Sequence, residues 1–330
     1  MSSYNFFWKS YFETLTSRNI IISLRNNTNN KGIHQYHMES FKLNRIKFFL
    51  FLTLQVCTMP CFVYALYRYV REKNLRKTIN YHVIYLLLCT SFLFVTLGLS
   101  LSQIYMFTSY VYPSDDRFCS LWNWFHHSIN IINLFLMAFL SIERNILIFH
   151  SHILRTKRAK ILFHYCPILF CLLFPPLFYI GAIFLCPCTN HYDYTKLLCT
   201  SSCYFSNKYW ANIDLYFNNY IPLFIIPIFC GKLYINVIFQ RRRLQQQRGK
   251  WRRDRKMILQ LWIVSTLYLC MWLPLQITAV VCLYWNSSFL LQAQIDYMYL
   301  FPYFIHIIYP FILLFLISSK NLHRTINRLG

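Results

Sequence analysis

The sequence has few glycines and very few acidic residues for its length. Only 6 of its 330 residues are glycine, and Asp and Glu together number 10. It also lacks low-complexity tracts, internal repeats and any long linker after the N-terminal segment, which indicates one domain. Its first forty residues show no long apolar core followed by small residues at a cleavage site, so we expect no removable signal peptide.

Apolar residues are abundant instead. Hydrophobic residues make up 57% of the chain and aromatic residues 20%, which is more apolar surface than one soluble core can bury. The net charge of +23 is grouped in short clusters between long apolar runs, as in membrane proteins. A nucleic-acid-binding protein would carry its basic residues on a folded soluble face, so this class is disfavoured.

Seven apolar stretches are long enough to cross a bilayer, which takes about 20 helical residues. They lie near residues 48–69, 81–106, 121–149, 161–184, 221–239, 257–283 and 297–317. The sequence therefore predicts an all-α membrane protein with a seven-transmembrane helix bundle. We expect an extracellular N-terminal segment over 1–46, the transmembrane domain over 47–318, and a short cytoplasmic amphipathic helix over 319–330, where Leu322, Ile326 and Leu329 have helical spacing.

The orientation follows from the basic residues of the short loops. Lys and Arg crowd the loops after spans one, three and five and the tail after span seven, including a loop of about sixteen residues over 241–256. The opposite loops offer only Arg117, Lys196 and Lys208. This pattern places the N-terminus outside, although a basic cluster before span one opposes it (Lys42, Arg45 and Lys47). The glycosylation sequons at Asn26 and Asn286 both fall on the outer side.

Five of the 13 cysteines gather at the predicted outer face (Cys119, Cys186, Cys188, Cys199 and Cys203). An oxidising compartment permits disulfides there. A zinc site is the alternative, because the Cys186/Cys188 and Cys199/Cys203 pairs have the spacing of ligand pairs. We favour disulfides and expect no metal.

The third span carries the most informative motif. Cys119 precedes Arg144 by 25 residues, which corresponds to roughly 37 Å of helix and places the two residues at opposite membrane surfaces. In this spacing, and in Glu143-Arg144-Asn145, the span resembles that of the rhodopsin-like (class A) G-protein-coupled receptors, with Asn145 in place of the family's tyrosine. A Glu-Arg pair alone is more often an ordinary helix-end ion pair.

The sixth and seventh spans extend this resemblance. Trp272 and Pro274 stand in a Cys-Met-Trp-Leu-Pro run similar to the family's Cys-Trp-x-Pro, and the proline provides a pivot. Asp254 lies where many members hold an acid that pairs with the span-three arginine, although a solvated local ion pair is the alternative. Tyr309-Pro310 retains the proline of the family's seventh-span motif but not its asparagine. The resemblance thus implies an activation switch made by Glu143, Arg144, Asn145, Asp254, Trp272, Pro274, Tyr309 and Pro310.

The resemblance also implies a ligand site among the outer halves of spans three, five, six and seven. Span seven has Tyr303 where an opsin has its retinal lysine, and span three has His126 where an amine receptor has its aspartate, so both classes are disfavoured. The remaining candidates are His126, His127, Asp214, Gln276, Asp296, Tyr299 and Tyr303. They favour a peptide-like ligand, with an odorant-like small molecule next. The two adjacent histidines could instead form a metal or proton site, but packing is the more common role.

We therefore expect a multi-pass plasma-membrane glycoprotein that binds an extracellular ligand and activates a heterotrimeric G protein, rather than an enzyme, and we expect no cofactor. By the same resemblance Cys119 pairs with Cys199 or Cys203, and Cys188 is a further disulfide candidate. The alternative is a transporter or channel of seven spans. Such a protein would show buried mid-membrane charges, broken helices or an inverted repeat, and the sequence shows no repeat.

Overall fold

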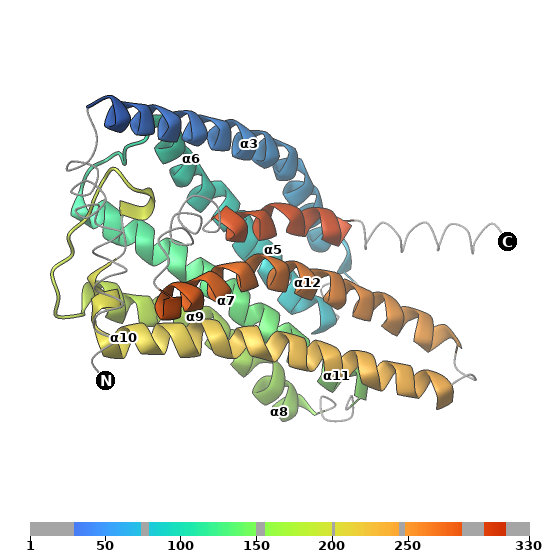
Figure 1. Ribbon diagram of the computed structural model, residues 1–330. Coiled ribbons are helices and arrows are strands. Elements are labelled where there is room, and N and C mark those ends of the chain that lie inside the picture. The colour runs from blue at the N-terminus through green and yellow to red at the C-terminus, as the bar shows by residue number, and fades with distance from the viewer. Residues whose placement is uncertain are drawn as a thin grey trace.

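The computed structural model describes residues 30–73, 79–149, 156–199, 202–243, 248–285 and 300–314. Within these ranges all regular structure is helical, and the helices form one bundle (Figure 1). Six helices are long and apolar enough to cross a membrane, and a shorter apolar helix covers Phe301–Leu314. The predicted seven-helix membrane fold is therefore confirmed. The amphipathic helix expected over 319–330 lies outside the described residues.

The spans follow one another in chain order. Span one is α3 (Asn30–Arg71), span two runs through α5 (His82–Leu93), η2 (Phe94–Gly98) and α6 (Leu99–Thr108), and span three is α7 (Asp116–Phe149). Span four comprises α8 (Lys157–Lys160), η4 (Ile161–Tyr165) and α9 (Cys166–Phe184). Span five comprises α10 (Lys208–Ile213), η7 (Asp214–Tyr220) and α11 (Ile221–Arg243), and span six is α12 (Arg248–Trp285). The helix Phe301–Leu314 is span seven.

Helix α7 is the central element of the bundle. Its most apolar window is 78% buried, against 28% for span one, and it packs against α5, α9, α11 and α12. Large apolar side chains on the other spans point outward, among them Val56, Leu169, Leu177, Phe224 and Ile228. In a bilayer those surfaces would contact lipid. Helix α7, in contrast, is surrounded mainly by the side chains of the other helices.

Two predicted boundaries were wrong. Span five begins near Lys208 rather than at residue 221, because its outer turns include polar residues (Asp214, Asn218 and Asn219) that interrupt the apolar run. The basic segment 241–256 is not a sixteen-residue loop, because α11 continues to Arg243 and α12 already begins at Arg248. Arg, Lys and Gln are good helix formers, so both helices continue beyond their apolar parts.

The basic cluster before span one has a local explanation at Arg45. Its guanidinium carbon lies 3.9 Å from the ring centroid of Phe107 and 5.0 Å from that of Phe41. Cation–π contact of this kind is favourable at a bilayer interface. The arginine is therefore accommodated at the outer end of the bundle, and its position does not require the reverse topology.

Among the described residues, three spans contain π-helical turns: η2 in span two, η4 in span four and η7 in span five. Such a turn inserts one extra residue and changes which side chains face the core, and it is frequently found at functional sites. Two of these turns carry polar residues that are buried in the bundle, His164 in η4 and both Asp214 and Asn218 in η7.

Candidate functional site

The inner end of α7 carries three consecutive buried polar residues. Glu143 is 1% exposed, Arg144 is 2% exposed and Asn145 is 6% exposed. Burial of charged groups is costly unless they are paired. A partner protein could not reach the Arg144 side chain in this conformation.

Glu143 is bonded to a histidine of span four. The carboxylate oxygen Oε1 pairs with Nδ1 of His164, which is 0% exposed, and Nε2 of His164 lies 3.1 Å from Nδ1 of His82 at the start of α5. His82 and His164 were missed as site residues, because an isolated histidine in an apolar run gives no indication of which face it occupies.

Asn145 links span three to span five. Its side-chain amide donates to the carbonyl oxygen of Ser141 in its own helix and to that of Phe229 in α11, each at 2.9 Å. Nearby, Cys230 Sγ lies 3.6 Å from Ser141 Oγ and 3.0 Å from Ser265 Oγ of α12. Spans three, five and six therefore meet through polar contacts on the inner half of the bundle.

The other switch candidates lie on spans six and seven. Trp272 is buried in α12 and half-buried Pro274 lies within the same helix. Tyr309 is buried and donates its hydroxyl to the carbonyl oxygen of Ile84, 3.0 Å away, and Pro310 beside it is also buried. Asp254 belongs to the helix α12, but its side chain lies outside the described part of the structure.

A buried polar network crosses the middle of the bundle. The Tyr303 hydroxyl lies 2.7 Å from Ser102 Oγ and 3.4 Å from His126 Nδ1. One turn deeper, His306 places Nδ1 3.0 Å from Ser91 Oγ and Nε2 3.4 Å from Asn130 Oδ1. Spans two, three and seven are joined here. Two candidates from the sequence, His126 and Tyr303, belong to this network, whereas Ser102, Asn130 and His306 were missed.

Three of the other ligand candidates, Asp214, His127 and Gln276, lie among the described residues. Buried Asp214 accepts hydrogen bonds from Tyr179 at 2.6 Å, Asn218 at 2.8 Å and Tyr204 at 3.2 Å, and half-buried His127 stacks on Tyr179. Gln276, also half-buried, donates to Asn219 at 3.4 Å. Asp296 and Tyr299 lie outside the described residues, as do the sequons at Asn26 and Asn286.

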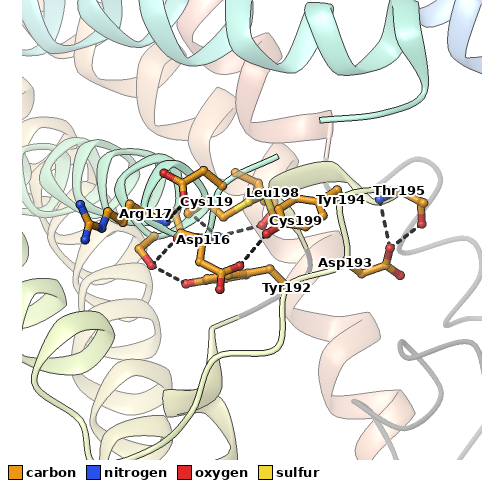
Figure 2. Close-up of a disulfide and its surroundings, with 12 residues drawn as sticks. Asp116, Arg117, Cys119, Tyr192, Asp193, Tyr194, Thr195, Leu198 and Cys199 are labelled. Atoms are coloured by element: carbon orange, nitrogen blue, oxygen red, sulfur yellow. Dashed lines mark hydrogen bonds between the residues drawn. A yellow bond between two sulfur atoms is a disulfide. The ribbon is translucent and has the colours of Figure 1, made fainter. Parts of the chain in front are cut away.

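The outer loop between spans four and five is fixed by two disulfides. Cys119 is bonded to Cys199, and Cys188 to Cys203. Figure 2 shows the first of these bridges at the outer end of α7. Since all four sulfurs are bonded in pairs, they do not form the zinc-ligand set considered above, and no group of three or more metal-ligating side chains occurs among the described residues. Cys186 remains a buried thiol whose pKa is raised by burial.

Hydrogen bonds hold the same loop against α7 (Figure 2). Tyr194 donates its hydroxyl to Asp116 at 2.6 Å, and this bond raises the pKa of Tyr194 to about 12. Asn123 donates to the carbonyl oxygen of Leu198 at 2.8 Å. Leu198 has a left-handed backbone with φ of 59°, a strained conformation for a bulky residue, so the disulfide and this hydrogen bond together stabilise a turn that the chain disfavours.

Asp193 forms a small polar cluster within the loop. It accepts hydrogen bonds from the Thr195 amide at 3.0 Å and hydroxyl at 2.5 Å, and it lies 3.5 Å from Lys196 Nζ. Burial alone would raise the pKa of Asp193, but these hydrogen bonds and the lysine charge outweigh it and hold the pKa below its usual value. The loop is therefore ordered by its own side chains.

The chain is similar to known proteins at the level of sequence pattern and of fold. The family model described as 7 transmembrane receptor (rhodopsin family) matches residues 62–313. The crystal structure of squid rhodopsin has a similar fold, with a TM-score of 0.60, 16% sequence identity and coverage of 82% of each chain. At this identity the structural likeness concerns the fold alone. No curated protein sequence matches the chain.

Proposed function

The chain belongs to the rhodopsin family of seven-transmembrane receptors, and on that premise we propose that it is a plasma-membrane receptor that binds an extracellular ligand and activates a heterotrimeric G protein. Family membership makes it a multi-pass G-protein-coupled receptor and not an enzyme. The ligand class, the coupling and the cellular membrane are the proposed parts.

The observation that supports this function is the arrangement of contacts along α7. Its outer end is bonded to the ligand-side loop through Cys119, its middle is hydrogen-bonded to span seven through His126 and Asn130, and its inner end holds Arg144. A ligand that changes the outer contacts can therefore bias the position of the inner end through one rigid helix.

Activation requires that the inner face open. Arg144 is only 2% exposed, so a G protein must bind a different conformation of the bundle. A ligand with higher affinity for that conformation increases its population, and a bound G protein raises ligand affinity in return. Pro274 lies within α12 and interrupts its backbone hydrogen bonding, which makes it the pivot for outward motion of the inner half of span six.

A peptide-like ligand fits the outer surface best. His126 and Tyr303 bond to each other, His306 bonds to side chains of spans two and three, and all three residues are buried. The mid-bundle polar groups are therefore already engaged. The disulfide-fixed loop, in contrast, presents exposed polar side chains beside exposed Asp115 and Asp116 at the start of α7. An odorant-like small molecule that displaces part of the inner network is the second candidate.

A library of peptides and metabolites, screened in cells with a promiscuous G protein and a reporter, tests the proposal. We expect at least one compound to give a dose-dependent signal that requires the intact receptor. Ion flux or substrate uptake in cells that lack G proteins would overturn the proposal and favour a transporter or channel.

A further inference from the structure

We infer that His164 is a positioning residue of the activation switch, which holds the Glu143 carboxylate toward span four and away from Arg144. The inference rests on the proposed function, because it concerns the same switch. It is carried by a contact between spans three and four, Glu143 Oε1 with His164 Nδ1, and by the second histidine, His82, behind it.

The burial pattern of η4 indicates a polar role for His164. The other four residues of this turn, Ile161, Leu162, Phe163 and Tyr165, are large and between 43% and 60% exposed on the surface of the bundle, whereas His164 is 0% exposed. The single residue turned into the bundle is thus the polar one. A π-helical hydrogen bond closes the turn, from the amide of Cys166 to the carbonyl oxygen of Ile161, and its extra residue sets this register.

The hydrogen-bond directions depend on the charge of Glu143. When Glu143 is ionised, its carboxylate only accepts, so Nδ1 of His164 is the donor in this contact. With a single ring proton on His164, the other nitrogen, Nε2, accepts from Nδ1 of His82 across 3.1 Å. His82 therefore orients the His164 ring, in the way that an outer residue orients a ligand or a catalytic histidine.

Glu143 depends on this contact. Its second carboxylate oxygen, Oε2, has no hydrogen-bond partner in the part of the chain that the structure describes. An under-coordinated buried carboxylate is costly, and the next residue along α7 is the cationic Arg144. Without His164, we expect the carboxylate to turn to Arg144 and hold it more strongly, which would make the arginine less available to a G protein.

If His164 and Arg144 compete for the Glu143 carboxylate, two substitutions should have opposite effects on basal activation. Glu143→Gln removes the charge that both His164 and Arg144 attract, so basal G-protein activation should rise several-fold. His164→Leu leaves the charge with Arg144 alone, so basal activation should fall about tenfold, within the usual range of coupling between sites. In the Glu143→Gln background, His164→Leu should have no further effect, because it acts only through the carboxylate.

The experiment measures ligand-independent nucleotide exchange on the promiscuous G protein by each purified variant in phospholipid vesicles. His164→Asn is the conservative variant, since its amide can still donate to Glu143 and should keep activation within about twofold of the unsubstituted receptor. Leu162→Ala, at a residue of the same turn that is 60% exposed, is the matched control and should change nothing. An equal fall caused by His164→Leu in both backgrounds, or a His164→Asn variant as impaired as His164→Leu, overturns the inference.

Thermal unfolding of the same variants separates this inference from the proposed function. The double-substitution cycle should show coupling between residues 143 and 164, because they are in direct contact. If no variant activates the G protein, the proposed function fails, and this cycle alone decides whether the contact exists. If the unfolding-temperature shifts of the two single variants simply add in the double variant, residues 143 and 164 are not coupled and the inferred contact is wrong.

Discussion

Asn145 donates its side-chain amide to the backbone carbonyl oxygen of Phe229 across 2.9 Å, and this bond ties span three to span five directly beside Arg144. The asparagine stands where the family's motif has tyrosine. In this receptor the position therefore serves as an interhelical tether in the closed conformation.

Replacing Asn145 by Leu should destabilise that closed conformation. The lost hydrogen bond is worth about 1 kcal/mol, so we expect basal G-protein activation to rise by up to about fivefold and the unfolding temperature of the purified receptor to fall. Thr96→Val is the control, because the Thr96 hydroxyl bonds only to carbonyl oxygens of its own helix. Unchanged basal activation in Asn145→Leu would show that the tether does not hold the closed state.

Arg144→Ala should abolish ligand-driven signalling while surface expression persists. In the proposed mechanism the arginine is the cation that meets the G protein when the inner face opens, and alanine offers no charge there. Surface labelling of a tagged receptor and a reporter assay measure the two quantities in the same cells. Arg117→Ala, at an exposed residue at the outer end of α7, should behave as the unsubstituted receptor. Full signalling by Arg144→Ala would exclude a role for this residue in coupling.

In the mid-bundle network, His306→Leu should destabilise the receptor more than Tyr303→Phe. Loss of His306 leaves Asn130 Oδ1 and Ser91 Oγ without the imidazole that bridges them, and such buried groups cost about 1–3 kcal/mol each. Loss of the Tyr303 hydroxyl is milder, since Ser102 still donates to the carbonyl oxygen of Gly98 at 3.0 Å. Thermal unfolding in detergent compares the two variants, and equal shifts would contradict this ranking.

Much of this fold follows from the sequence because bilayer thickness sets the length of each apolar run, and the charge of the loops sets their side. The polar contacts do not follow in the same way. His164, Asn130 and His306 each look like interruptions of an apolar run. Their partners are on other spans, and the π-helical turns shift the face on which a residue lies. His126 and Asn130, four residues apart, share one face of α7, and this spacing was the one available signal.

The depressed pKa of Asp193 in the outer loop predicts how stability depends on pH. The folded pKa of Asp193 is depressed, so its contribution to stability is present above the unfolded pKa of about 3.9 and is lost as the pH falls through the folded value. Thr195→Val removes the hydroxyl donor and should raise the Asp193 pKa, whereas Thr195→Ser should keep it low. Carboxyl NMR of ¹³C-aspartate-labelled receptor, with Asp193→Asn for assignment, measures the titration. An Asp193 pKa that does not move in Thr195→Val would mean that the amide and Lys196 suffice.

The disulfide pattern gives the most direct chemical test of the outer face. The sequence left Cys199 and Cys203 as alternative partners of Cys119, and the structure joins Cys119 to Cys199 and Cys188 to Cys203, leaving Cys186 as a thiol. The two bridges span 80 and 15 residues. Since loop-closure entropy grows with loop length, from about 3 kcal/mol at 15 residues to between 4 and 5 near 100, Cys119→Ser should reduce surface expression more than Cys188→Ser. Non-reducing peptide mapping should recover a Cys119–Cys199 peptide, with alkylation of Cys186 only after the loop is unfolded. A peptide that joins Cys119 to Cys203 would contradict this pairing and the position of the loop over α7.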